Sequence, residues 1–282
     1  MKKIIVFVIF LSSCKKDVIL EKLPTTSVEV SNNIISNVVK GYPCADTTNY
    51  DVFNGIRFVN TNTYGNKPYG ALIVNKNDGY PIYDGNESSR FEVRDGDCGW
   101  NDGFSDCQTD RSRSEIHEKD FENYSLNKVV TYIVHVYIPN QSKFRPLGSS
   151  NLLVMNQINY SDSLGKVFGA LAYLVMEQNN NLIIRTHKDF TWVGLRDYTI
   201  TNTPFDKWIT LKYEIKMSNN EDGYIKVFVN ENLLVYENRP TIPSKTGLIN
   251  LKLGIYNSFR SSAKESYSTQ IMYIDGVSKK IN

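Results

Sequence analysis

A strict alternation of apolar and polar residues is the feature that most limits how this chain can fold. Residues 208–217 read WITLKYEIKM, and from the second residue on every other side chain is apolar, with Thr, Lys or Glu between. Successive side chains of a strand point to opposite faces, so this run predicts a strand with one buried and one solvated face. The runs YIKVFVN at 224–230 and LLVYE at 233–237 follow across short polar turns, which predicts two antiparallel hairpins.

The same texture continues from about residue 50 to the end of the chain. Further short strands are predicted at 129–138, 182–186 and 270–274, and clusters of Gly, Asn, Asp and Pro lie between such runs. No long helical pattern with caps, no repeat of 20–50 residues and no Pro-rich or Ser-rich linker is visible in the sequence. The sequence therefore predicts a single all-β domain, an antiparallel β-sandwich of the jelly-roll type.

The N-terminal residues have the pattern of an export signal. Residues 1–13 read MKKIIVFVIFLSS, with two lysines, a short apolar run and two serines, which is too short to span a bilayer as a mature helix. The tetrapeptide ending in Cys14 resembles the lipobox of bacterial lipoproteins, and the alternative is an ordinary signal peptide with an incidental cysteine. We expect a lipoprotein signal peptide at 1–13, a lipidated Cys14 and tether at 14–45, and the jelly-roll domain at 46–282.

Composition excludes several classes of protein. The chain has 282 residues of which 41% are hydrophobic, enough for a full core, and a mean hydropathy of −0.35 excludes a multi-span membrane protein. A formal charge of +2 argues against a strongly cationic nucleic-acid binder. We expect an exported monomer, anchored through Cys14 at the outer membrane, the cell surface or in the periplasm, with no nucleic-acid partner.

Cysteines and acidic residues gather in one short loop. Cys98 and Cys107 enclose a polar, Gly-rich segment, and in an oxidising compartment they are the predicted disulfide, although Cys44 could pair with either of them instead. The loop also carries five Asp or Asn side chains: Asp95, Asp97, Asn101, Asp102 and Asp106. A structural calcium ion is therefore an alternative to a metal-free loop, which we prefer because Trp100 stands where an EF-hand loop needs Gly. We expect no catalytic metal and no required cofactor.

Three segments carry side chains suited to chemistry. They are RSRSEIH at 111–117, MNQIN at 155–159 and LKLGIYNS at 251–258. If residues 111–117 form a strand, Arg111, Arg113, Glu115 and His117 share one face. Such a face suits a polyanion, because arginine forks bind carboxylates, but solvated surface ion pairs are the plain alternative.

Taken together and in this order, the segments resemble the jelly-roll polysaccharide lyases, a group that includes alginate lyases, glucuronan lyases and lyases like heparin lyase I. These enzymes carry R-x-E-x-R, then Q-x-H, then Y-F-K-x-G-x-Y, and the counterparts here are 113–117, 157–159 and 251–258. The segments FEVRDGDCGW, DKW, DGYIKVFVNEN and YID also look like this group, so the resemblance spans about 90–275. It implies a jelly roll that cleaves an anionic, uronate-containing polysaccharide.

The resemblance also implies roles for individual residues. Arg113 matches the arginine aimed at the substrate carboxylate, Gln157 the amide that hydrogen-bonds it, and Tyr256 the tyrosine that serves as acid and in some members also as base. Two positions depart from the pattern, because Asn159 replaces the usual histidine base and His117 replaces the second arginine. We therefore hypothesise that His117 is the base. The remaining candidate substrate-binding residues are Arg94, Arg111, Glu115, Asn159, Lys252 and His187, of which His187 is also a second candidate for the base.

The predicted reaction is β-elimination, in which no water attacks the sugar, so the paired carboxylates of a hydrolase are not needed. Fixed donors neutralise the uronate carboxylate, a base removes the C5 proton and an acid protonates the leaving oxygen. The main alternative is a non-catalytic carbohydrate-binding jelly-roll lipoprotein, which Asn159 would favour. A glycoside hydrolase is a third, for which Glu115 and Glu92 would have to supply the two carboxylates.

Overall fold

The structure is a computed structural model of the whole chain, and a defined set of residues is described here. These are residues 50–53, 56–59, 67, 69–101, 104–118, 123–140, 153–161, 167–177, 180–188, 190, 194–201, 205–243, 246–258 and 269–282. The predicted signal peptide, the tether, Cys14 and Cys44 lie outside these residues. Within the described part of the chain, no helix is long and apolar enough to cross a membrane.

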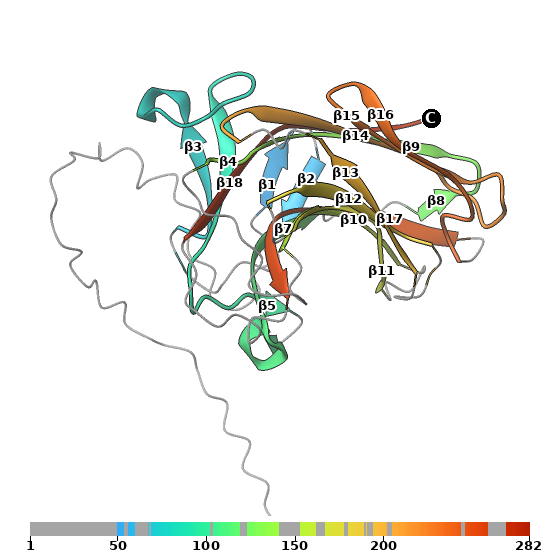
Figure 1. Cartoon of the computed structure of the whole chain (residues 1–282), viewed down its shortest axis with the longest axis horizontal. Coiled ribbons are helices and arrows are strands. Elements are labelled where there is room, and N and C mark those ends of the chain that lie inside the picture. Colours follow the sequence, from blue (N-terminus) through green and yellow to red (C-terminus); the bar gives the residue numbers. More distant parts are fainter. Residues whose placement is uncertain are drawn as a thin grey trace, which may run out of the picture. The chain divides into compact units, whose positions relative to one another are not determined.

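Most of the described residues belong to two antiparallel sheets, which Figure 1 shows as curved, stacked layers. Sheet A has the order β1 (Tyr50–Phe53), β2 (Ile56–Val59), β7 (Arg111–Glu118), β17 (Thr246–Ser258), β10 (Leu153–Ser161), β11 (Val167–Met176), β12 (Leu182–His187) and β13 (Leu195–Ile200), and β8 (Asn123–Ser125) pairs with part of β17. Sheet B has the order β16 (Asn232–Asn238), β15 (Tyr224–Val229), β14 (Trp208–Lys216), β9 (Val129–Tyr137), β18 (Gln270–Ile281), β4 (Glu87–Val93) and β3 (Ala71–Asn75). The short strands β5 (Trp100–Asn101) and β6 (Phe104–Ser105) form a separate ribbon, and the 3₁₀ turns are η1 (Lys76–Asp78) and η2 (Asp106–Thr109).

The alternating run at 208–217 forms β14, and the burial of its residues alternates along the whole strand as predicted. The hairpin from β15 to β16 turns at Asn230 and Glu231, which have φ angles of 47° and 69°. Two consecutive residues in this left-handed region match the twist of the flanking strands, which explains the tight connection. The predicted hairpins are therefore confirmed, and the predicted strand at 270–274 extends to residue 281 as β18.

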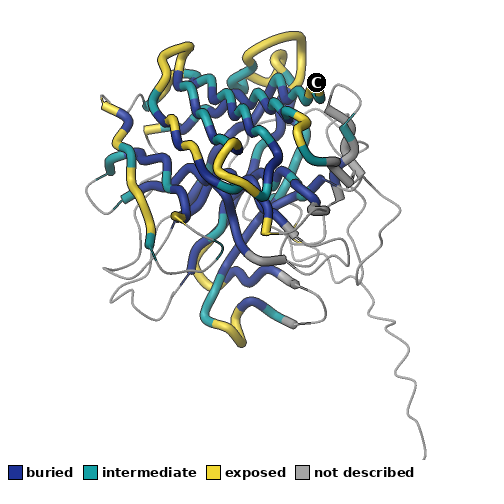
Figure 2. Tube along the Cα trace, turned by 90° about the vertical axis from the view of Figure 1, so that its right-hand side faces the viewer, coloured by how far each residue is buried: buried dark blue, intermediate teal, exposed yellow. Residues whose placement is uncertain are grey.

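The main core lies between the two sheets and is built from the inward residues of both. Figure 2 shows the buried stretches following the strands, with exposed residues gathered at turns. Two buried phenols also hydrogen-bond from sheet B to sheet A. Tyr132 donates to Glu118 Oε2 over 2.7 Å, and Tyr213 donates to Asn156 Oδ1 over 2.9 Å. These bonds satisfy polar atoms that would otherwise be costly in an apolar interior.

A second buried polar group links the edge strand β16 to β12 and β13. Glu237 accepts hydrogen bonds from Thr186 Oγ1 at 2.7 Å, Tyr198 OH at 2.8 Å and Arg239 Nε at 2.8 Å. Burial alone would raise the pKa of Glu237, but these donors outweigh burial and hold it below its ordinary value. The Glu237 carboxylate is thus ionised, and its hydrogen bonds connect sheet B to sheet A.

The face of sheet A that points away from the core is partly apolar as well. Val154, Ala170, Tyr173, Val175 and Ile183 form a smaller buried cluster, and Tyr256 packs against it. This outer face therefore differs from the solvated face of β14. It carries the side chains that the sequence singled out.

Candidate active site

Three neighbouring strands of sheet A bring the three sequence motifs together. Strand β17 lies between β7 and β10, and Tyr256 is directly opposite Arg113 of β7. Lys252 lies between His117 of β7 and Gln157 of β10. Because residues opposite each other in a ladder share a face, all five side chains belong to the outer face of sheet A.

Tyr256 is held by two arginines of the neighbouring strand. Its hydroxyl accepts a hydrogen bond of 2.7 Å from Arg111 Nε, and the guanidinium carbon of Arg113 lies 4.5 Å from the centre of its ring. Burial raises the pKa of the Tyr256 phenol above its ordinary value, although the charges of Arg113 and Arg111 oppose that rise. The phenol is therefore protonated at neutral pH. An oxygen that accepts from Arg111 still has its own proton to give to a substrate atom.

Arg113 is almost fully buried, with 6% of its surface exposed, and is paired with two carboxylates. Its Nε and Nη2 donate to the two oxygens of Asp106 over 2.5 and 2.8 Å, and its Nη1 lies 3.4 Å from Glu115 Oε2. Burial alone would lower the pKa of Arg113, but Glu115 and Asp106 raise it above its ordinary value. The guanidinium is therefore a fixed positive charge beneath the Tyr256 ring.

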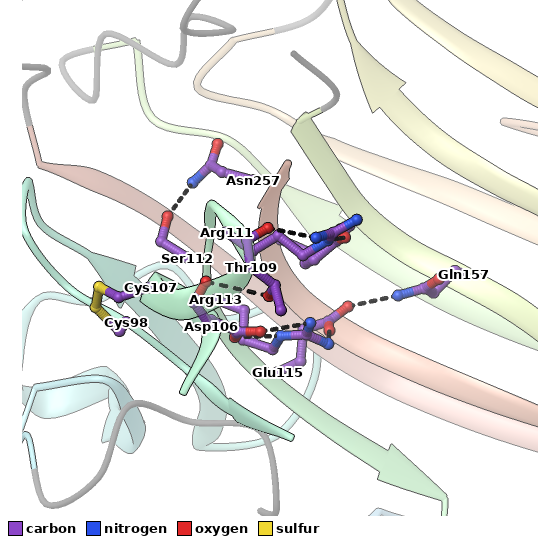
Figure 3. A network of polar contacts seen from close by, with 11 residues as sticks. Cys98, Asp106, Cys107, Thr109, Arg111, Ser112, Arg113, Glu115, Gln157 and Asn257 are labelled. Carbon is purple, nitrogen blue, oxygen red and sulfur yellow. Dashed lines mark hydrogen bonds and ion pairs between the residues drawn. A yellow bond between two sulfur atoms is a disulfide. The ribbon is translucent and has the colours of Figure 1, made fainter. Parts of the chain in front are cut away.

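Glu115 joins this cluster to β10. It is completely buried, and its Oε1 accepts a hydrogen bond of 2.7 Å from Gln157 Nε2 (Figure 3). The sequence predicted that Glu115 contacts substrate. In the structure Glu115 is the carboxylate that links Arg113 and Gln157, and its contact with substrate stays a prediction.

The predicted disulfide is confirmed. Cys98 and Cys107 are bonded, with their Cα atoms 5.2 Å apart, and Cys107 belongs to η2 together with Asp106. The carbonyl of Thr109 in the same turn accepts a hydrogen bond from Arg111 Nη1 (Figure 3). The disulfide loop, through Asp106, and the end of η2, through Thr109, thus contact both arginines that hold Tyr256.

His117 lies at the other end of β7, opposite Lys252 on one side and Val59 of β2 on the other. It is four residues from Arg113, which is about 13 Å along a strand. The Tyr256 hydroxyl is bound by Arg111, which lies at the opposite end of β7 from His117. The structure places Tyr256 and His117 on one face of sheet A, and the role of His117 as base stays a prediction.

Asn159 and His187 lie further across the same sheet. Asn159 is buried and pairs with Asn250 of β17 and Ala170 of β11, two residues along β10 from Gln157. His187 is buried at the end of β12, with its ring 5.7 Å from that of Tyr173. The substrate-binding roles predicted for Asn159, Lys252 and His187 are not tested by these positions.

Two side chains on this face were missed by the sequence analysis. Tyr173 of β11 lies opposite Gln157, and Arg185 of β12 lies opposite Tyr173. Arg185 donates from Nε and Nη2 to Asp197 of β13 over 2.5 and 2.7 Å. Tyr173 and Arg185 thus continue, on β11 and β12, the row of polar side chains that Lys252 of β17 and Gln157 of β10 begin. Only the pairing of the strands reveals this row, because neither residue belongs to a motif.

Arg94 lies elsewhere, just after β4 of sheet B. Its guanidinium carbon is 3.6 Å from the centre of the Tyr69 ring, and its Nε donates to the buried Glu92. Arg94 thus contacts Tyr69 and Glu92, and binding of substrate by Arg94 stays a prediction.

Two acidic side chains of the disulfide loop, Asp97 and Asp106, are engaged with protein donors. Asp97 accepts from Tyr69 OH at 2.8 Å and from the Arg94 amide at 2.7 Å, while Asp106 binds Arg113. Among the described residues, no group of three or more His, Cys, Asp or Glu side chains could hold a metal ion. Asp102 lies outside those residues, and the calcium alternative remains untested.

Comparison with known proteins identifies the class of enzyme that this fold and site define. Residues 75–278 match the family model described as Polysaccharide lyase, and the chain belongs to this family. The predicted enzyme class is therefore confirmed, and the chain is a polysaccharide lyase. No curated protein sequence matches the chain.

Solved structures of lyases share the fold. An endo-β-1,4-glucuronan lyase from the fungus Trichoderma reesei is 14% identical with a TM-score of 0.54, covering 82% of this chain and 93% of that one. The alginate lyase A1-II′ with a bound product (GGG) is 14% identical with a TM-score of 0.53, covering 69% and 80%. The alginate lyase AlyC3 with dimannuronate is 15% identical with a TM-score of 0.51, covering 69% and 74%. These matches confirm the predicted jelly-roll fold.

Proposed function

We propose that this lyase cleaves a uronic-acid-containing polysaccharide by β-elimination on the outer face of β7, β17 and β10. The observation that carries the proposal is the placement of Tyr256, whose hydroxyl is bound by Arg111 and whose ring covers Arg113. An anionic substrate fits this site because two guanidinium groups and the Gln157 amide converge on it. The structural relatives are described as acting on alginate or glucuronan, which supports a uronate polymer.

The reaction removes the proton on C5, next to the uronate carboxylate. The C5–H electron pair forms the C4–C5 double bond, the bond from C4 to the glycosidic oxygen breaks, and that oxygen takes up a proton. Charge builds up on the carboxylate in the transition state, so donors fixed beforehand stabilise it most effectively. Arg113, Gln157 and Asn159 are the donors on this face. Tyr256, which is protonated, gives the proton to the leaving oxygen.

The same phenol serves as the base in this proposal. Asn159 has no basic nitrogen, and His117 lies about 13 Å along the strand from Arg113, at the opposite end of β7 from Arg111, which binds the Tyr256 hydroxyl. Because Tyr256 starts protonated, it gives its proton to the leaving oxygen as the C4–O bond breaks, and the phenolate that forms takes the C5 proton in the same step, which restores the phenol. Arg111 stabilises the phenolate while it exists. His117 is the alternative base predicted from the sequence, and the two assignments differ in the activity expected of the His117→Ala variant.

The test is the ultraviolet absorbance of the unsaturated uronate product. The domain without residues 1–14 is incubated with alginate, glucuronan, other uronate polymers and a neutral glucan, and absorbance is followed with time. One uronate polymer and not the glucan should give a rise. Tyr256→Phe should abolish the rise, and Tyr173→Phe is the matched control, because Tyr173 is a second tyrosine on the same face.

Variants of His117 then decide the base. Activity of His117→Ala within about threefold of the wild type supports Tyr256 as the base, whereas a loss of about a hundredfold or more supports His117. If no polymer gives product while one of them binds, the non-catalytic alternative is favoured, and Asn159 is the residue that favours it.

The location of the protein is part of the proposal. The export pattern of residues 1–13, the lipobox-like sequence at Cys14 and the disulfide support an exported lipoprotein. Mass spectrometry of the full chain extracted from bacterial membranes should find Cys14 as an acylated N-terminal residue. Recovery of Cys14→Ser in the membrane fraction in the same amount as the wild type would contradict the anchor.

A further inference from the structure

The disulfide loop reaches the site through Asp106. This carboxylate is 98% buried and binds the Nε and Nη2 edge of Arg113 through both of its oxygens. Its neighbour in η2 is Cys107, and the chain on the other side of the disulfide is Cys98-Gly99. Few conformations of the loop are compatible with such a two-point contact to a planar guanidinium.

Gly99 packs directly against this ion pair. Its carbonyl accepts a hydrogen bond of 2.8 Å from the Asp106 amide. A Cβ atom at position 99 would lie 2.1 Å from Arg113 Cγ and 2.1 Å from Asp106 Oδ2. The loop backbone therefore approaches the pair so closely that only glycine fits between them.

The contact with Asp106 occupies one edge of the Arg113 guanidinium. A guanidinium has five N–H groups, and Asp106 uses two of them while Glu115 uses one on Nη1. The two that remain belong to Nη1 and Nη2, so these two nitrogens, called here the Nη1–Nη2 fork, are left for a substrate carboxylate. If Asp106 moved, the guanidinium could turn about its side chain and this fork would no longer be fixed.

We propose that Asp106 is a positioning residue for Arg113 and that the Cys98–Cys107 disulfide keeps Asp106 in place. The bond makes the orientation of the Nη1–Nη2 fork, and through it the lyase activity, dependent on oxidation of the loop. The proposal rests on the proposed function in one respect, because Arg113 is taken to bind the substrate carboxylate.

A double-mutant cycle separates positioning from a merely structural role. Asp106→Asn should lower kcat/KM about tenfold in the wild type. In the background of Arg113→Lys, which keeps the charge but has no fork, the same change should alter kcat/KM by less than about twofold. Equal losses in both backgrounds would overturn the proposal. Asp97→Asn is the matched control, since Asp97 is a buried carboxylate of the same loop that binds Tyr69, and its kcat/KM should stay within about twofold.

The disulfide is tested in the same way. Dithiothreitol transfers two electrons to the disulfide, which gives two thiols and the oxidised reagent. At a temperature where the reduced protein is still folded, kcat/KM should fall about tenfold on reduction and recover on reoxidation. The variant Cys98→Ser/Cys107→Ser should behave like the reduced protein and lose nothing further with Asp106→Asn. Full activity of a folded double-serine variant would overturn the role of the disulfide. If that variant does not fold, reduction of the wild type and Asp106→Asn decide.

A second measurement needs no substrate. The Nε–H resonance of Arg113 in the nuclear magnetic resonance spectrum, assigned by its loss in Arg113→Lys, should exchange with solvent about ten times faster in Asp106→Asn and in the reduced protein. Unchanged exchange would overturn the proposal whatever the activity. A wild-type chain that forms no product from any uronate polymer would instead refute the proposed function, and the exchange rates would still decide whether Asp106 holds Arg113.

Discussion

Replacing Gly99 with alanine tests the arrangement around Arg113 by steric means. The new Cβ would lie 2.1 Å from both Arg113 Cγ and Asp106 Oδ2, whereas carbon atoms in contact are about 3.5–4.0 Å apart. The ion pair must therefore shift by roughly 1.5 Å, the difference between these distances. A misplacement of about 1 Å near the chemistry can cost about a hundredfold in rate, so we expect kcat/KM to fall by about that factor. The free energy of unfolding should fall by about 1–3 kcal/mol because the site is overpacked.

Gly223→Ala is the matched control for this prediction. A Cβ there would lie 2.4 Å from the Arg239 carbonyl, which is a comparable clash outside the site. Its stability should fall by a similar amount, while kcat/KM stays within about twofold. Both variants are compared by urea unfolding and by the rate of formation of the unsaturated product. The reasoning is refuted if the two variants are equally stable and Gly99→Ala has the same kcat/KM as Gly223→Ala.

Three further predictions concern stability. Cys98→Ser/Cys107→Ser should lower the free energy of unfolding by about 2.5 kcal/mol in urea, because the bond closes a loop with a sequence separation of 9, and an unchanged midpoint would contradict this. The pKa of Glu237 is lower in the folded state than in the unfolded state, so its ionised carboxylate stabilises the fold above the unfolded-state pKa, and this stabilisation is lost as the pH falls through the folded-state pKa. The melting temperature should therefore drop more on acidification for the wild type than for Glu237→Gln, and parallel curves of melting temperature against pH would contradict this prediction. Tyr213→Phe should cost about 1–2 kcal/mol in urea unfolding, because Asn156 Oδ1 loses a buried donor, and a neutral effect would show that this bond adds nothing.

The sandwich could be predicted from the sequence because its clearest strands have one solvated face. In β14 the polar residues between apolar ones mark the period of two directly. Strand β10 is buried on both faces along most of its length, so its residues show little alternation. The sequence singled out the segment 155–159 through its motif and not through its pattern, and its place beside β17 comes from the structure alone.

The site could be predicted only as far as the motifs reach. The resemblance identified Tyr256 and Arg113, which the structure places opposite each other. It could not give the hydrogen bond from Arg111 to Tyr256, because that bond depends on how β7 and β17 pair across 145 residues of sequence. Tyr173 and Arg185 are on the same face for a similar reason, since strand register is set by the whole sheet. The distance of His117 from Tyr256 also follows from register alone.

The most direct test of the central claim compares Tyr256→Phe with Tyr173→Phe on a uronate polymer that the wild type cleaves. Both changes remove one hydroxyl from the same face of sheet A, and only Tyr256 is bound to Arg111 and stacked over Arg113. We predict that Tyr256→Phe forms no unsaturated product while binding the polymer as tightly as the wild type, and that Tyr173→Phe remains active. Product formation by a folded Tyr256→Phe variant at the wild-type rate would contradict the assignment of this face as the lyase site.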